Sequence, residues 1–170
     1  MKCTFNNSLT LCSLAILTFT GQSTFAASAS ATGNGSATVI SPIAISETTT
    51  LGFGDFATGA GGSVVIATDG SRTVTGDVSL SSTDAGAQAV FAVTGESAYT
   101  YAITLPTGSA TLDDGSGNTL SVGTWTSDPS GTGILTGGAE NLNVGATITV
   151  GSKQTPGTYT GTYTITVDYN

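Results

Sequence analysis

Apolar and polar residues alternate along most of the chain after residue 37. In one clear example, every second position is apolar: Leu142, Val144, Ala146, Ile148 and Val150. Strict alternation is typical of a β-strand with one buried face and one solvated face, whereas an amphipathic helix repeats every 3.6 residues. Because no window shows a convincing helical repeat, the sequence predicts strands throughout.

The predicted strands are separated by turn signals rich in glycine, aspartate and proline. They cover residues 37–46, 61–67, 72–82, 88–95, 98–106, 118–126, 141–150 and 159–169. Short strands at regular spacing with little helix are typical of an antiparallel sandwich. The pattern therefore predicts an all-β fold, an immunoglobulin-like β-sandwich of Greek-key type, as one domain over residues 37–170.

The N-terminal segment has a different composition from this domain. Residues 1–26 combine a single lysine, an apolar run from Leu9 to Phe19 and small residues, which is the pattern of a secretory signal peptide. The run is too short to span a bilayer as a helix. We expect cleavage after Ala26, with Ala29 as the alternative. Residues 27–36, ASASATGNGS, carry no bulky apolar side chain and predict a flexible leader.

The net charge and the cysteine content limit which kinds of partner and cross-link the mature chain can have. Cys3 and Cys12 both lie in the predicted signal peptide, so the mature chain has no thiol and a disulfide framework is excluded. It keeps Arg72 and Lys153 against 11 acidic residues, a net charge of 2 − 11 = −9. Such a surface repels phosphate backbones, so no nucleic-acid partner is expected. We expect an exported mature chain with no membrane span, in the periplasm in transit and then at the cell surface or extracellular.

Residues suited to catalysis or metal binding are scarce. The chain has no histidine, which excludes Ser-His-Asp and Cys-His catalysis and imidazole metal sites. A hydrolase with two carboxylates is the remaining enzymatic possibility. The segment 113–118, DDGSGN, offers Asp113, Asp114 and Asn118 to Ca²⁺, but it lacks the alternating calcium-loop pattern, and a hairpin loop is the simpler interpretation. We predict no catalytic residue, no cofactor, no metal and no enzymatic activity.

The C-terminal segment carries the most regular alternation of all. Every second residue is apolar or glycine: Gly157, Tyr159, Gly161, Tyr163, Ile165, Val167 and Tyr169. With Tyr169 penultimate, this pattern resembles the C-terminal strand of chaperone–usher pilus (fimbrial) subunits. The resemblance implies a sandwich that lacks its last strand, so that these residues form an edge for a partner strand. It also implies a periplasmic chaperone that lends a strand, an outer-membrane usher, and a later donor strand from the next subunit.

Other parts of the chain resemble a bacterial secreted family known as a domain of unknown function, number 4402. The matching pieces are SPIAI (41–45), LGFGDF (51–56), FAVTG (91–95), YAITLP (101–106), NLNVGATITV (141–150) and GTYTGTYTITVDY (157–169). The resemblance covers about residues 37–170. Within this region Val39, Ile43 and Ile45 form the candidate donor segment, although the same residues equally fit the domain's own first strand.

These observations favour a structural role over catalysis. The first hypothesis is an exported, pilin-like subunit that assembles at the cell surface through β-strand complementation, with other copies of itself or related subunits as partners. The alternative is a self-complete secreted binding module for a glycan or a surface protein, acting through loops at 107–117 and 125–140. Trp125 suits a glycan site, but a single tryptophan in a sandwich is more often packed into the core.

Overall fold

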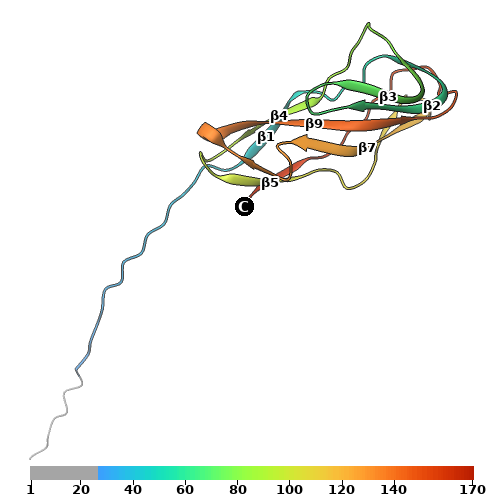
Figure 1. Ribbon diagram of the computed structural model, residues 1–170. Helices are drawn as coiled ribbons and strands as arrows, with labels where there is room; N and C mark the ends of the chain where they lie inside the picture. The colour runs from blue at the N-terminus through green and yellow to red at the C-terminus, as the bar shows by residue number, and fades with distance from the viewer. Residues whose placement is uncertain (1–26) are drawn as a thin grey trace, which may run out of the picture. The chain divides into compact units, whose positions relative to one another are not determined.

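The computed structural model describes residues 27–170. The predicted signal peptide, with both cysteines, lies outside the described residues. The chain divides into two compact units, residues 1–37 and residues 38–170. Of the first unit, residues 27–37 are exposed and form neither helix nor strand (Figure 1). Within residues 27–170, no helix has the length and apolar character needed to cross a bilayer.

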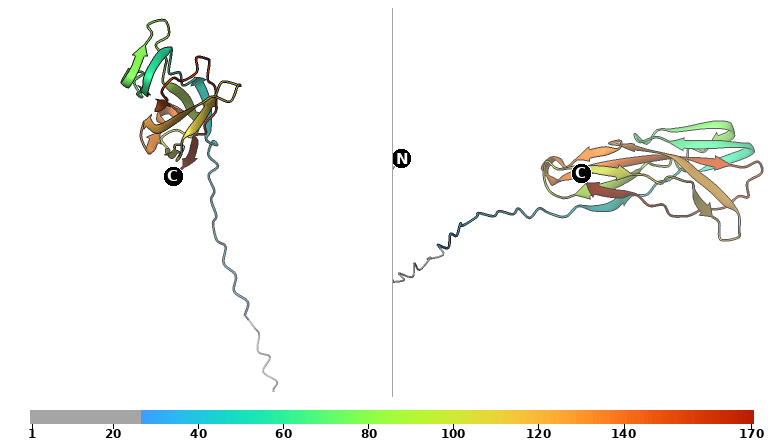
Figure 2. Two further views of the ribbon diagram at one scale, coloured as in Figure 1. Left: turned by 90° about the vertical axis from the view of Figure 1, so that its right-hand side faces the viewer. Right: turned by 90° about the horizontal axis from the view of Figure 1, so that it is seen from below.

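Residues 38–170 form two antiparallel β-sheets, which confirms the predicted all-β sandwich (Figure 2). One short 3-10 helix, η1 (Thr136–Gly138), precedes the longest strand. The strands are β1 (Ala44–Thr49), β2 (Phe56–Ile66), β3 (Arg72–Leu80), β4 (Ala89–Thr94), β5 (Thr100–Thr104), β6 (Ala110–Asp113), β7 (Thr119–Asp128), β8 (Thr132–Ile134), β9 (Ala139–Val150) and β10 (Thr166–Tyr169).

The larger sheet is organised around β9. Strand β4 pairs with its first half, β2 pairs with its second half, and β7 overlaps both along the opposite edge. Gly145 lies where β2 ends and β4 begins, and a Cβ atom there would come 2.4 Å from the carbonyl oxygen of Ile66. Strands β1, β3 and β6 extend the sheet from β4, β2 and β7. The smaller sheet has the order β10–β5–β8.

The alternating residues of the sequence form the core in two clusters. The first lies under β2, β7 and the second half of β9, and the second lies between the two sheets around β4, β5 and β10. The apolar series from Leu142 to Val150 is at most 2 % exposed. Tyr101 is fully buried in the second cluster, where its hydroxyl donates a hydrogen bond of 2.8 Å to the Glu140 carboxylate. Period-two alternation therefore identified the core correctly.

The two largest differences between predicted and observed strand bounds lie at the starts of β1 and β10. The strand expected over 37–46 begins only at Ala44, directly after the region of Pro42, which has no N–H for a ladder. The strand expected over 159–169 pairs only from Thr166 to Tyr169. Continuing that register would place Thr164 opposite Pro106, which again offers no N–H, so the ladder stops. Farther back, Thr160 forms an isolated bridge with Asp113.

Candidate functional site: a groove beside the C-terminal segment

Residues 159–169 keep alternating burial although only their last four form a strand. The side chains of Tyr159, Tyr163, Ile165, Val167 and Tyr169 are buried or half-buried, whereas the threonines between them and Asp168 are exposed. Gly161 is exposed but runs against β6, where a Cβ atom would come 2.3 Å from the carbonyl oxygen of Thr111. Glycine is therefore required for this close approach, and the segment lies over the core as predicted.

One side of this segment has no main-chain partner within residues 27–170. The N–H groups of Thr160 and Asn170 donate to the carbonyl oxygens of Asp113 (3.0 Å) and Thr100 (3.2 Å). Because peptide groups alternate in direction along an extended chain, the N–H of Ile165 faces the opposite side. In the described part of the chain, no strand pairs with that side of β10.

Strand β1 has a free edge of the same kind. Among the described residues it pairs with β4 alone, and β10 pairs with β5 alone. Ile45 on β1 and Val167 on β10 nevertheless pack in the same core cluster. The two free edges, one from each sheet, thus border one part of the core.

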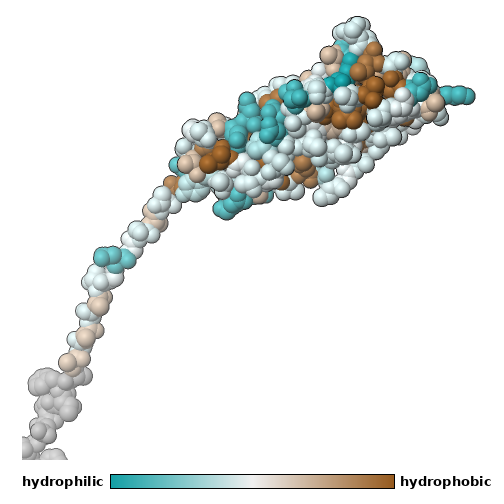
Figure 3. Space-filling view, in the orientation of Figure 1, coloured by the Kyte–Doolittle hydropathy of each residue, from teal (hydrophilic) through white to brown (hydrophobic). Residues whose placement is uncertain are grey.

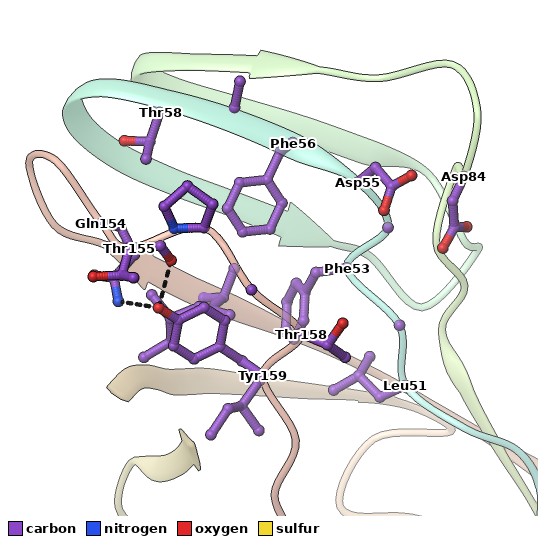
Figure 4. Close-up of a pocket in the computed structure, with 18 residues that line it drawn as sticks. Leu51, Phe53, Asp55, Phe56, Thr58, Asp84, Gln154, Thr155, Thr158 and Tyr159 are labelled. Carbon is purple, nitrogen blue, oxygen red and sulfur yellow. Dashed lines mark hydrogen bonds between the residues drawn. The ribbon is translucent and has the colours of Figure 1, made fainter. Parts of the chain in front are cut away.

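An apolar groove continues this open side. It lies between residues 50–58, which follow β1, and residues 154–163, which precede β10 (Figure 4). Its wider part measures about 700 Å³ and its narrower part about 150 Å³, and both are lined by Leu51, Phe53, Leu112 and Tyr159. Apolar side chains also reach the surface at the end of the domain that carries β2 and β3 (Figure 3). We call the groove between residues 50–58 and residues 154–163 the C-terminal groove.

Hydrogen bonds fix the loop that forms one wall of the groove. The Tyr159 hydroxyl donates to the carbonyl oxygen of Thr155 at 2.6 Å and accepts from the Gln154 side chain at 2.9 Å (Figure 4). Gln154 also donates to the carbonyl oxygen of Thr119 at 3.2 Å. The wall therefore has a defined conformation before any ligand is present.

The other wall is held by Arg72, the arginine of β3. Its guanidinium donates to the carbonyl oxygens of Phe53 (3.0 Å), Asp55 (3.4 Å), Ser81 (2.7 Å) and Asp84 (2.9 Å). These bonds tie the loop after β1 to the loop after β3. Gly54, at φ +67°, leaves room for this contact, because a Cβ atom would lie 2.2 Å from Arg72 Nη1. Arg72 is therefore a positioning residue for the groove.

Tyr163 lies at the narrow end of the groove. Its ring packs on Trp125 with centroids 4.7 Å apart and meets Phe91 edge-on at 6.3 Å. Its hydroxyl is buried and has no hydrogen-bond partner among residues 27–170. Burial, and secondly the negative charge of Glu47, raise the pKa of Tyr163 to about 12. Glu47 stands opposite Phe91 in the β1–β4 register, so its carboxylate lies on the same side as this aromatic cluster.

The predicted edge residues divide between the groove and the second core cluster. Gly157 lines the wider part, Gly161 and Tyr163 line the narrower part, and Tyr159 lines both. Ile165, Val167 and Tyr169 pack in the second core cluster. The Tyr169 hydroxyl donates to the carbonyl oxygen of Ser41 and accepts from the N–H of Glu96. This contact anchors the end of β10 to the segment before β1.

The candidate donor residues have different positions. Val39 is 95 % exposed. Ile43 and Ile45 are half-buried against the second core cluster, and Ile45 pairs with Val93 inside β1. In this structure Ile45 belongs to the domain's own first strand and Ile43 directly precedes it, which agrees with the alternative that the sequence left open.

The DDGSGN segment is the hairpin loop between β6 and β7. The Asp114 carboxylate accepts bonds from the Asn118 side chain and from the N–H groups of Ser116 and Asn118, which together hold its pKa below the usual value. Asp113 accepts from the N–H of Gly115 at 2.6 Å. Within residues 27–170, no group of three or more acidic side chains is arranged to hold a metal ion.

The loops considered for a glycan site contain further structure. Residues 107–117 include β6, and residues 125–140 include β8 and η1. The alternation predicted none of these three elements. Trp125 is half-buried against both core clusters, and its Nε1 donates to the carbonyl oxygen of Gly108 at 3.1 Å. Its ring therefore packs against the core and lines the narrow part of the C-terminal groove.

Comparisons with known proteins identify the family but no characterised relative. The search of curated proteins and the search of solved structures return no match. A family model described as "Domain of unknown function (DUF4402)" matches residues 43–169, which is nearly the whole sandwich. The predicted family is thereby confirmed, and the chain belongs to this family.

Proposed function

We propose that this chain is an exported, non-catalytic structural subunit that assembles at the cell surface by accepting a β-strand beside its C-terminal segment. The partners are other copies of the chain or related subunits, and a periplasmic chaperone and an outer-membrane usher handle it during export. The resemblance of residues 157–169 to the C-terminal strand of pilus subunits supports this proposal.

One observation supports it most strongly. The main chain of residues 161–165 lies outside any strand, yet Tyr163 and Ile165 are still directed at the core. Exposed sheet edges are usually protected by proline, charge or a bulge. Residues 159–169 contain no proline, and Asp168 is their one charge. An incoming strand would pair with the free N–H and C=O groups and cover the groove, as in β-strand addition.

The test is reversible denaturation of the protein, as a bacterial host yields it, with and without an extended peptide. We expect marginal stability or aggregation of the protein alone. A capped peptide that alternates valine and threonine should raise the melting temperature in a concentration-dependent way, because a ligand that binds only the folded state stabilises it.

A pair of variants isolates the main-chain contribution. Ile165→Pro and Ile165→Ala both truncate the side chain, but only proline removes the N–H that faces the free edge. Because Ile165 lies outside the β10–β5 ladder, proline there breaks no strand pairing. The peptide should stabilise Ile165→Ala and fail with Ile165→Pro. Equal stabilisation of both variants would contradict strand pairing at this edge.

The self-complete binding module is the second candidate because the largest core side chains are shielded from solvent. Tyr101, Ile66, Leu135 and Leu142 are fully buried without any added strand. A domain that needed a partner strand would be expected to leave more of its core open. Cooperative, monomeric unfolding at high stability, unchanged by the peptide, would refute the subunit proposal and favour this module.

A further inference from the structure

The C-terminal groove carries negative charge at both ends. Asp55 and Asp84 line its wider part, on the side away from the Gln154–Tyr159 wall (Figure 4). Glu47 is exposed on β1 beside the Tyr163 end. Neither Arg72 nor Lys153, the basic residues of the described chain, lines the groove. An occupant of the groove therefore meets carboxylates at each end of an apolar channel, and at the wider end Asp55 and Asp84 together outweigh the single positive charge of Arg72 bound to their carbonyl oxygens.

The leader of a second copy does not complement such a surface. Residues 27–37 contain no charged side chain and nothing larger than threonine or asparagine. Of the bulky residues that follow, Val39 and Ile40 are adjacent and so point to opposite sides of an extended chain, whereas Ile43 and Ile45 pack against the second core cluster. Arg72 cannot supply the positive charge to the groove of a second copy, because its guanidinium is hydrogen-bonded to four carbonyl oxygens of its own domain.

The groove has room for large side chains. Its wider part, about 700 Å³, has the size of a typical ligand pocket and is lined by the rings of Phe53, Phe56 and Tyr159. Alanine and glycine would leave most of this volume unfilled, and unfilled apolar volume forfeits packing energy. Valine, isoleucine, leucine or phenylalanine at alternate positions of an extended chain would fill it.

We propose that the occupant of the C-terminal groove is an extended segment of a different protein, with bulky apolar residues at alternate positions and lysine or arginine at its two ends. This inference rests on the proposed strand-accepting function. The apolar residues cover Phe53 and Tyr159. The basic residues face Asp55 and Asp84 at one end and Glu47 at the other. Such flanking charges set the direction of the bound strand and speed its association.

The experiment compares peptides that differ only in these features. Three capped probes are used: an alternating valine–threonine peptide with lysine at both ends, the same peptide with glutamate at both ends, and the leader sequence of residues 27–42. Binding to the intact protein is measured by fluorescence anisotropy at low and high salt. We expect the lysine-flanked peptide to bind about tenfold or more tightly than the other two, with the advantage shrinking at high salt.

Charge variants locate the effect. Asp55→Asn combined with Asp84→Asn keeps the side-chain shapes and should remove most of the lysine preference. Asp128→Asn removes one charge outside the groove and should leave the preference unchanged. Equal or tighter binding of the leader peptide or the glutamate-flanked peptide would overturn the inference while leaving the proposed function intact. Failure of all three peptides to bind would overturn the proposed function itself.

Discussion

Replacement of Arg72 tests how the groove is held together. Its guanidinium serves four carbonyl oxygens, and the bonds to Phe53 and Ser81 are the ones in part-buried positions. The carbonyl oxygens of Asp55 and Asp84 are exposed, so water can replace the guanidinium as their hydrogen-bond donor with little loss of stability. A buried acceptor without a donor costs about 1–3 kcal/mol. Because water reaches these sites in part, we expect Arg72→Met to lower the free energy of unfolding by about 2–4 kcal/mol.

A lysine at the same position separates charge from geometry. Arg72→Lys keeps the positive charge, but one ammonium nitrogen replaces a planar fork that reaches several carbonyls at once. Arg72→Lys should therefore lower the free energy of unfolding by roughly 1–2 kcal/mol, which is about half of the loss expected for Arg72→Met. The control is Lys153→Met, which removes a basic residue from an exposed turn and should change stability by less than about 0.5 kcal/mol.

The assay is urea denaturation followed by tryptophan fluorescence and circular dichroism, with the slope of the transition compared between variants. The same variants are tested for peptide binding, since Phe53, Asp55 and Asp84 all line the groove. A loss below about 1 kcal/mol for Arg72→Met would refute the assignment of Arg72 as the residue that joins the two loops. Equal stability of the lysine and methionine variants would show that the positive charge and its hydrogen bonds contribute nothing.

Two further predictions concern the C-terminal segment. Ile165→Ser should lower the free energy of unfolding by about 1–3 kcal/mol because Ile165 is half-buried, whereas Thr164→Ser on the exposed side should cost less than about 0.5 kcal/mol in the same urea assay. The pKa of Tyr163 is raised from 10.0 to about 12, so the folded protein keeps the hydroxyl proton to a higher pH than the unfolded chain does. The protonated hydroxyl therefore contributes fully to stability below pH 10, and this contribution is lost as the pH rises towards 12. Tyr163→Phe should make the stability curve between pH 10 and 12 less steep, and an identical slope in both proteins would contradict the pKa assignment.

The sequence predicted the core better than the edges of the sheets. Alternation in the 141–150 segment identified the buried face of β9, because a strand with one wet face repeats every two residues. The short strands β6 and β8 escaped notice, since three or four residues carry too little pattern to be recognised. The end of the β10 ladder depends on Pro106, a residue more than fifty positions away along the chain. Pairing of this kind is visible only once the fold is known.

The groove was predictable in part. The apolar stripe of the C-terminal segment was read directly from the sequence, and it forms one wall. The other wall, residues 50–58, shows no periodic pattern, because its shape depends on main-chain carbonyls bound by Arg72. Carbonyl groups are common to all residues and leave no trace in the sequence. A single arginine in a chain of this composition was the one available signal.

The central position of β9 has a consequence for the order in which this chain folds. The two halves of β9 hold β4 and β2 end to end, and residues 89–94 and 56–66 have no direct ladder to each other. The larger sheet therefore cannot form before residues 139–150 emerge from the ribosome. Contacts between partners so distant along the chain form slowly. Through most of its synthesis the chain is therefore left without its central strand, and the edges of β2 and β4 that β9 later covers stay unpaired.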